Sequence, residues 1–336
     1  MRSRDLLARS RPHTTLFAVV LLLSLLPRAG RCQISPQLAD LIRTGNEYRI
    51  GALTILGGDF GLSGGSFKYT GNIGQFSSDI ESDVTKGGGA GDIGDPRQLG
   101  SLDVGWQLRV QGNMGSLESR VVPRAGLFAG DQDEFTTRAI EFGGGARFWV
   151  SDHFSLAPTL MGLYGQTSNN YTARSAFMRA NQNLAAQLGL IDWRIDTWTL
   201  RAAVNLQYII TWNRAIITLS SDPTYFHTKG FDSSNANVKI YGDSGSLANK
   251  VDVDVPLGIE INGHELRSGG YLSRTELLGD LETGLGVQHM NEIHGRVVLD
   301  FLNQYWKFQW IGVGASYLWG PNITGWTVGA DVAFRF

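Results

Sequence analysis

The chain has 336 residues, of which 42% are hydrophobic, 18% are charged and one is a cysteine. The net charge is −2, so the chain lacks the excess of basic residues that is typical of nucleic-acid-binding proteins. Cys32 is the single cysteine, which excludes a disulfide framework and a thiolate metal centre. The chain contains 43 glycines and many short stretches in which apolar and polar residues alternate, a pattern that is typical of β-strands.

The N-terminus has the organisation of a secretory signal peptide. Basic residues from Arg2 to Arg11 precede an apolar run at residues 16–26, followed by proline and small residues. This run is shorter than the about 20 residues that a transmembrane helix needs. We expect a signal peptide over residues 1–32, with cleavage after Cys32. An exported chain without further cysteine indicates a bacterial envelope. Lipidation of Cys32 is the alternative, which the preceding Arg31 disfavours.

Residues 33–48 are predicted to form a short helix and a linker. Ser35 suits the N-cap, Pro36 suits the first helical position, and Leu38, Leu41 and Ile42 share one face.

The region that follows begins with weak strand signals at residues 49–56 and 66–70. Residues 71–100 are rich in Gly, Ser and Asp and have the composition of a loop, so we predict a long flexible loop there. Its Gly88–Gly91 run lacks the aspartate and the repetition of calcium-binding β-rolls, and no Gly-Lys-Ser/Thr phosphate loop is present.

Alternation is clear in the middle of the chain. Strands are predicted at residues 102–111, 121–128, 140–150, 154–164 and 200–211. The predicted connections between them are a short turn at residues 151–153, a second long loop with a helical turn at residues 168–182, and a short turn at residues 196–197. Residues 215–250 give no clear assignment.

The C-terminal third alternates again, in strands predicted at residues 251–261, 281–288 and 293–301. Past Ile311 the apolar set changes parity, which indicates a β-bulge. Residues 305–336 are predicted to form a final hairpin. In its last strand, from Trp326 to Phe336, every second residue is apolar or aromatic, and polar or small residues stand between them.

Repeated alternation, a secretory leader and a terminal aromatic residue together favour a transmembrane β-barrel, which is apolar outside and polar inside. We therefore predict an all-β fold, a single antiparallel barrel over residues 49–336. Tryptophans near the predicted strand ends fit interfacial aromatic girdles. The helix at residues 33–48 then has two possible placements, as a cap or as a plug in the lumen. Few apolar positions are predicted to face inward, which disfavours the plug.

The charged residues of the polar faces are predicted to line the lumen and to pair with one another as a salt-bridged filling. A hydrated path for solutes through the lumen is the alternative. This predicted set consists of Asp103, Arg109, Glu141, Arg147, Arg201, Asp252, Asp254, Glu260, Glu282, Arg296, Asp300, Lys307, Asp331 and Arg335.

Signals for catalysis are weak. His289 and His294 flank Glu292 but lack the helical His-Glu-x-x-His spacing of a zinc site. A loop-borne acid–base group of Asp222, His227 and Asp232 is the other arrangement considered. We assign no catalytic, metal-binding or cofactor-binding residue.

The final segment, WGPNITGWTVGADVAFRF at residues 319–336, resembles the last hairpin of bacterial outer-membrane proteins. The chain is most similar to the solitary autotransporter-like β-barrel group, which has a translocator barrel without a passenger. This resemblance implies about twelve strands, within a range of about ten to fourteen. It also implies that Phe334 and Phe336 are the signal to the barrel-assembly machinery. We expect a monomer in the outer-membrane bilayer.

Three functions follow in order of preference. The first is a structural or autotransporter-like barrel. The second is a porin or channel for small solutes, and the third is a barrel enzyme with catalytic loops.

Overall fold

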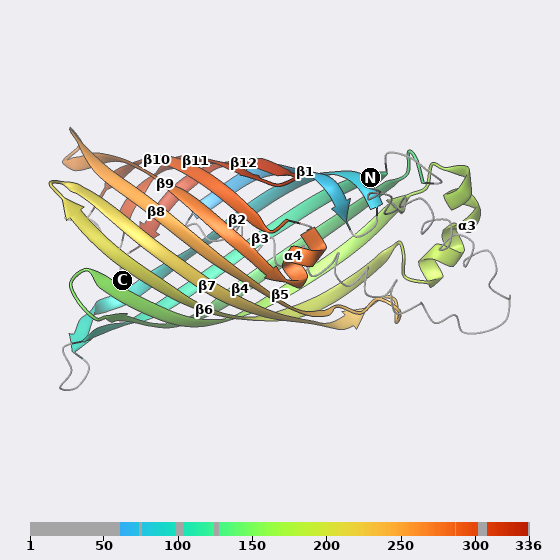
Figure 1. The fold of residues 1–336 in the computed structure, drawn as a ribbon, viewed down its shortest axis with the longest axis horizontal. Coiled ribbons are helices and arrows are strands. Elements are labelled where there is room, and N and C mark those ends of the chain that lie inside the picture. The colour runs from blue at the N-terminus through green and yellow to red at the C-terminus, as the bar shows by residue number, and fades with distance from the viewer. Residues whose placement is uncertain are drawn as a thin grey trace, which may run out of the picture. The chain divides into compact units, whose positions relative to one another are not determined.

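The computed structural model describes residues 61–73, 76–98, 104–123, 128–285, 287–301 and 308–334. The predicted signal peptide and N-terminal helix, and Asp103, Lys307, Arg335 and Phe336, lie outside these residues. The described residues form one closed antiparallel β-barrel (Figure 1). The predicted fold class is therefore confirmed, and so is the predicted count of about twelve strands.

The strands are β1 (Gly61–Ile73), β2 (Phe76–Gln98), β3 (Gly105–Pro123), β4 (Gln132–Trp149), β5 (Phe154–Thr172), β6 (Trp193–Trp212), β7 (Ala215–Ser233), β8 (Tyr241–Ile261), β9 (His264–Gly279), β10 (His289–Asp300), β11 (Phe308–Gly320) and β12 (Ile323–Phe334). Helix α3 (Ala176–Gln187) lies between β5 and β6, and helix α4 (Asp280–Leu285) lies between β9 and β10. Neither of these described helices has the length and apolar character to cross a bilayer.

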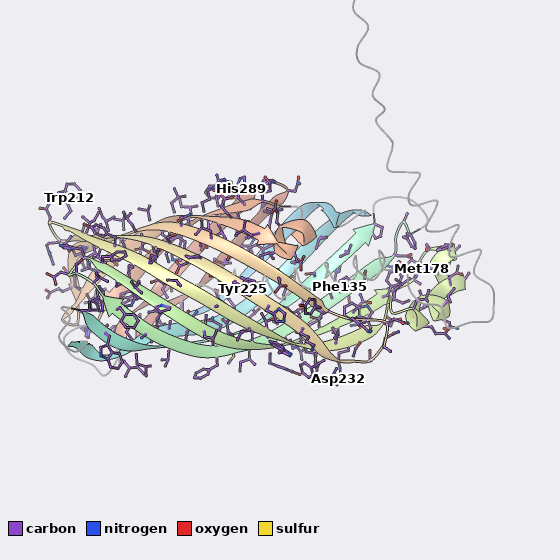
Figure 2. All side chains as sticks on the ribbon, turned by 60° about the horizontal axis from the view of Figure 1, so that its bottom comes forward. Phe135, Met178, Trp212, Tyr225, Asp232 and His289 are labelled. Carbon is purple, nitrogen blue, oxygen red and sulfur yellow. The ribbon has the colours of Figure 1, made fainter. Side chains whose placement is uncertain are left out.

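Each strand pairs with its neighbours in sequence, and β1 pairs with β12 to close the sheet. Closure matters in lipid, because an unpaired strand edge would leave backbone groups without hydrogen-bond partners. The odd-numbered strands end at one end of the barrel, called here the helical end because α3 and α4 are there. The even-numbered strands end at the opposite end. In Figure 2, Met178 of α3 marks the helical end and Trp212 of β6 marks the opposite end.

The outward face is apolar where the sequence predicts it. In β6, Leu200, Val204 and Tyr208 are exposed, and in β8 every second residue from Val251 to Ile261 is exposed. A wall of exposed apolar side chains this extensive requires lipid rather than water around it. The predicted final hairpin is confirmed, with its turn at Pro321 and Asn322.

The predicted β-bulge is also confirmed. The register between β11 and β12 shifts between Phe308 and Trp310. One extra residue in β11 therefore reverses the parity of the apolar set, as the sequence indicates.

The predicted loop at residues 71–100 is wrong, because residues 76–98 form β2, the longest strand of the described barrel. Glycine is required in this strand by close packing rather than by flexibility. A Cβ atom on Gly88 would lie 2.0 Å from Asn113 Oδ1 and 2.8 Å from the backbone oxygen of Gly112 in β3. Composition alone does not separate these two uses of glycine.

Four other predicted boundaries are corrected. Residues 121–123 end β3 instead of forming a returning strand, and the turn predicted at 196–197 lies inside β6. There Thr197 is buried and donates to the backbone oxygen of Gly165, while a register shift with β7 falls beside it. The loop predicted at 168–182 is the end of β5 followed by α3. The strand predicted at 281–288 begins as α4, after a reversal at Gly279 with φ of 68°.

Candidate functional site

The charged side chains meet across strands that are not neighbours, which places them on the concave inner face of the barrel. Arg147 of β4 is the centre of the first group. Its guanidinium donates to Asp92 Oδ2 of β2 at 2.9 Å, to Ser155 Oγ of β5 at 2.7 Å, and to Gln207 Oε1 of β6 at 2.6 Å. A weaker contact of 3.3 Å reaches Asn205 Oδ1. One buried arginine therefore ties four strands together.

Two further arginines extend this group. Arg109 donates to the other oxygen of Asp92 at 3.0 Å, so this carboxylate is shared by two guanidinium groups. Arg201 of β6 reaches Glu141 Oε2 of β4 at 3.0 Å, and Asn113 Nδ2 donates to the same oxygen at 2.8 Å. Glu141 is almost fully buried, so its charge requires these donors.

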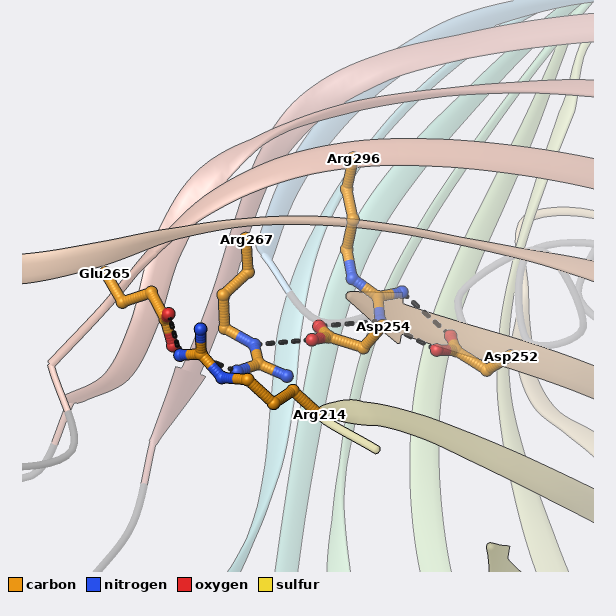
Figure 3. Close-up of polar contacts among 6 residues, drawn as sticks. All are labelled: Arg214, Asp252, Asp254, Glu265, Arg267 and Arg296. Atoms are coloured by element: carbon orange, nitrogen blue, oxygen red, sulfur yellow. Dashed lines mark hydrogen bonds and ion pairs between the residues drawn. The ribbon is translucent and has the colours of Figure 1, made fainter. Parts of the chain in front are cut away.

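A second charged group lies towards the opposite end, between β8, β9 and β10 (Figure 3). Arg296 forms a bidentate pair with Asp252 at 2.8 and 2.7 Å and lies 3.6 Å from Asp254. Arg267 Nε donates to Asp254 Oδ1, and Arg267 Nη1 lies 3.5 Å from Glu265. Arg214 then pairs with Glu265. Acids and bases alternate along this chain of contacts, so the charges neutralise one another locally.

A hydroxyl–imidazole–carboxylate chain crosses β10, β11 and β12. His294 Nδ1 lies 2.9 Å from Ser316 Oγ, and His294 Nε2 lies 3.2 Å from Asp331 Oδ2. The contact passes over Gly314, where a Cβ would lie 2.2 Å from the Asp331 carboxylate. The order of groups is that of an acyl-transfer triad. However, Ser316 is buried and Tyr271 stacks on the imidazole at 4.7 Å, so the arrangement is packed rather than open.

The inner face at the helical end is apolar. A buried cluster is built from strands β1–β3 and β9–β12 together with α4 and Val287 between α4 and β10, and is called here the apolar seal. It consists of Phe67, Ile80, Val84, Leu117, Leu277, Leu281, Val287, Met290, Leu318 and Ile323. Leu281 and Val287 are both 0% exposed. Side chains that line a wide water-filled channel remain accessible to water, whereas the side chains of this cluster are buried against one another. The sequence-based expectation of few inward apolar positions is therefore wrong.

Helix α3 is fastened to the helical end by a buried carboxylate. Asp131 accepts hydrogen bonds from the backbone N–H groups of Arg174 and Ser175, from the Ser175 hydroxyl and from the Tyr171 hydroxyl. Ser175 is also the N-cap of α3 and accepts from the Met178 N–H. Burial alone would raise the pKa of the Asp131 carboxyl, but these donors hold that pKa below its ordinary value.

Other predicted residues lie elsewhere. Glu260 is exposed beside the turn after β8, and Glu282 lies half-buried in α4 rather than in a strand. Asp300 ends β10, where its backbone oxygen lies 3.2 Å from His264 Nδ1. Phe334 ends β12 opposite Phe308.

Sequence reasoning missed several members of the network. Asp92 lies in the segment predicted as a loop, and Arg267 lies between two predicted strands in a stretch left unassigned. Asn205 and Gln207 are neutral and were predicted only as polar-face residues of their strand. Their inward orientation could have been predicted from the alternation of the strand. Asn205 and Gln207 are four and six residues from Arg201 and therefore lie on the same face of the strand.

The acid–base candidates are not brought together. All three lie in β7, not in a loop. Asp222 accepts from Asn205 on the inner face, whereas His227 lies 2.9 Å from Asp243 and 5.6 Å from the exposed ring of Trp198. Glu292 accepts from the Tyr271 hydroxyl at 2.9 Å. In the described part of the chain, no group of three His, Cys, Asp or Glu side chains has the geometry to hold a metal ion.

Comparisons with known proteins agree with this architecture. Residues 97–329 match the model of the solitary outer membrane autotransporter beta-barrel domain. The β-domain of the Bordetella autotransporter BrkA is 12% identical with a TM-score of 0.50, and the match covers 82% of this chain and 99% of that one. The transport unit of the autotransporter AIDA-I from Escherichia coli is 12% identical with a TM-score of 0.51, over 87% and 99% of the two chains. No curated protein matches the chain.

At this identity the two solved structures support the fold alone, whereas the family match spans more than half of the chain. The chain therefore belongs to the family of solitary outer membrane autotransporter β-barrel domains.

Proposed function

We propose that this protein is a monomeric outer-membrane barrel whose own side chains close its lumen, and that its role is structural rather than that of a solute channel. The apolar seal is the observation that carries this proposal. The proposal includes export by a signal peptide at residues 1–32, with the barrel beginning near residue 49. Insertion is by the barrel-assembly machinery, which reads Phe334 and Phe336.

The apolar seal supports closure because of where its side chains come from. Leu277 and Leu281 stand at the end of β9 and in α4, whereas Leu117 comes from β3, in the other half of the wall. Exposing one such leucine to water costs roughly 1.5–3 kcal/mol. A hydrated path through this level would expose several of them at once, so the closed arrangement is strongly preferred.

The charged half of the lumen supports a stiffening role. Three arginines there, Arg147, Arg201 and Arg296, each span one intervening strand, from β4 to β2 and β6, from β6 to β4, and from β10 to β8. Such contacts resist changes in the curvature of the wall. A permeation path instead requires weak, separable ion sites, and tightly paired guanidinium and carboxylate groups lack that property.

A channel for small solutes is the alternative, and efflux from lipid vesicles separates the two functions. Vesicles that contain the refolded protein should retain a small hydrophilic dye. Leu277→Asp together with Leu281→Asp places charge in the apolar seal and should increase leakage, whereas Leu184→Asp on the exposed face of α3 should not. Rapid efflux through the wild-type protein would contradict the closed lumen.

A further inference from the structure

The outer surface of β3–β6 changes from apolar to polar between one row of outward-facing residues and the next row towards the helical end. Met114, Ile140, Tyr164 and Trp198 stand side by side across these strands and are 61%, 52%, 45% and 40% exposed. Two residues further towards the helical end, the matching row is Ser116, Arg138, Gln166 and Asp196. Because alternate residues share a face, this second row also points outward.

The spacing of the rows places this change at a membrane boundary. Two residues advance a strand by about 7 Å, or by about 5 Å along the membrane normal at a tilt of about 45°. A third row, which contains Thr136, Ser168 and Arg194, lies about 5 Å further out. The headgroup layer on each side of the hydrocarbon core is roughly 5–8 Å thick. If the apolar row ends the hydrocarbon region, both polar rows lie among lipid headgroups.

A hollow lies in this layer between β4 and β5. Its volume is about 240 Å³, and it is lined by Thr136, Arg138, Gln166, Ser168 and Asn170. Pockets that enclose a whole drug-sized ligand measure about 300–1,000 Å³. The hollow is therefore of a size for one headgroup moiety rather than for a complete lipid.

The polar groups of the hollow are available to a ligand. The Arg138 side chain is exposed. Its guanidinium makes no hydrogen bond or ion pair with the residues that the structure describes. The Asp196 carboxylate, one strand further on, makes no ion pair with Arg138 in the described chain and accepts from the Tyr164 hydroxyl at 2.9 Å and from Gln166 Nε2 at 3.0 Å. Thr136, Ser168 and Asn170 likewise have no side-chain hydrogen bond within the described chain.

Nearby charges decide which side of Arg138 an anion can occupy. Arg194 of β6 lies 3.9 Å from Asp232, whose place on the outer surface is visible in Figure 2. Glu134 is held by Arg120 at 3.5 Å and by Gln132. Glu118 of β3 stands opposite Thr136, on the side of β4 away from the hollow. An anion is therefore disfavoured towards β3. Towards β5 the other side chains that line the hollow are uncharged, and the Asp196 carboxylate lies one strand beyond them.

We propose that this hollow binds the phosphate-bearing headgroup of a glycolipid in the adjoining leaflet, with Arg138 as the phosphate ligand. A guanidinium presents paired N–H donors that match phosphate oxygens, and the hydroxyl and amide side chains around it can bond sugar hydroxyls. The acyl chains would lie along the exposed apolar surface of Ile140 and Tyr164, directly below the hollow.

The test uses the refolded full-length chain in detergent, with native mass spectrometry as the binding measurement. The probes are bisphosphorylated lipid A, the same lipid without phosphate groups, and inorganic phosphate. The variants are Arg138→Gln and Arg138→Lys. Arg179→Gln, at an exposed arginine of α3, is the matched control. Heat-modifiable gel migration establishes that each variant is folded.

We expect Arg138→Gln to weaken binding of the bisphosphorylated lipid about tenfold, which is about 1.4 kcal/mol. Arg138→Lys should have a smaller effect, because it keeps the charge and loses the paired donors, and Arg179→Gln should change binding less than twofold. Equal effects of Arg138→Gln and Arg179→Gln, or equal binding of the lipid without phosphate, would overturn the proposal. Inorganic phosphate that binds as tightly as the lipid would overturn the lipid as occupant.

Discussion

Replacing Arg147 by methionine tests whether the inner charged network holds the barrel together. The Arg147 side chain is 5% exposed and contacts β2, β5 and β6. Removing one partner of a buried charge pair costs about 3–5 kcal/mol. Asp92 keeps Arg109 and is 25% exposed, so we expect a loss near the lower limit, about 3 kcal/mol. The measurement is urea unfolding from lipid vesicles followed by tryptophan fluorescence.

Arg120→Met is the matched control for this variant. Arg120 is 58% exposed and lies 3.5 Å from Glu134, and exposed pairs contribute about 0–1 kcal/mol. The reasoning would be refuted if the two variants differed by less than about 0.5 kcal/mol. A double-mutant cycle with Asp92→Asn should then give a coupling energy of about 0.5–3 kcal/mol, since the two side chains share a direct contact.

Three further predictions concern other parts of the barrel. Val204→Arg on the lipid face should lower the free energy of unfolding by about 2–4 kcal/mol. The control Ala236→Arg, in the exposed segment after β7, should change it by less than about 0.5 kcal/mol, and equal losses would refute the register of β6. Gly65→Val should prevent closure of the barrel between β1 and β12, because a Cβ would lie 2.2 Å from a backbone oxygen of β12. Gly64→Ala should fold, because the nearest atom to its Cβ would lie 3.9 Å away, and heat-modifiable gel migration measures both. The stabilisation of α3 by Asp131 should be complete above the unfolded-state pKa of about 3.9 and should be lost as pH falls through the lowered folded pKa. An acid-induced loss of amide-exchange protection in α3 that Asp131→Asn leaves unchanged would contradict this account.

The sequence was sufficient for the fold because lipid imposes a strict alternation on the outer face. Residues 200–211 and 251–261 could be assigned with the correct parity, since every second side chain there must be apolar. The parity change in β11 likewise revealed a bulge. These features depend on the solvent around the barrel, not on contacts that form only after folding.

The inner face was less predictable. Glycines such as Gly88 serve close strand packing, and their number made β2 look like a loop. The apolar seal combines residues from seven strands and one helix, and no local pattern marks their convergence. Within the charged network, Arg147 could be predicted to face inward. Its partners Asp92 and Gln207 depend on strand register, which a single sequence does not reveal.

Single-channel recording in planar bilayers tests the closed lumen most directly. The refolded wild-type chain should insert without producing stable, large conductance steps. The variant with aspartate at Leu277 and Leu281 should produce them, because both side chains belong to the apolar seal. Stable, large steps from the wild-type protein would contradict a lumen closed by its own side chains.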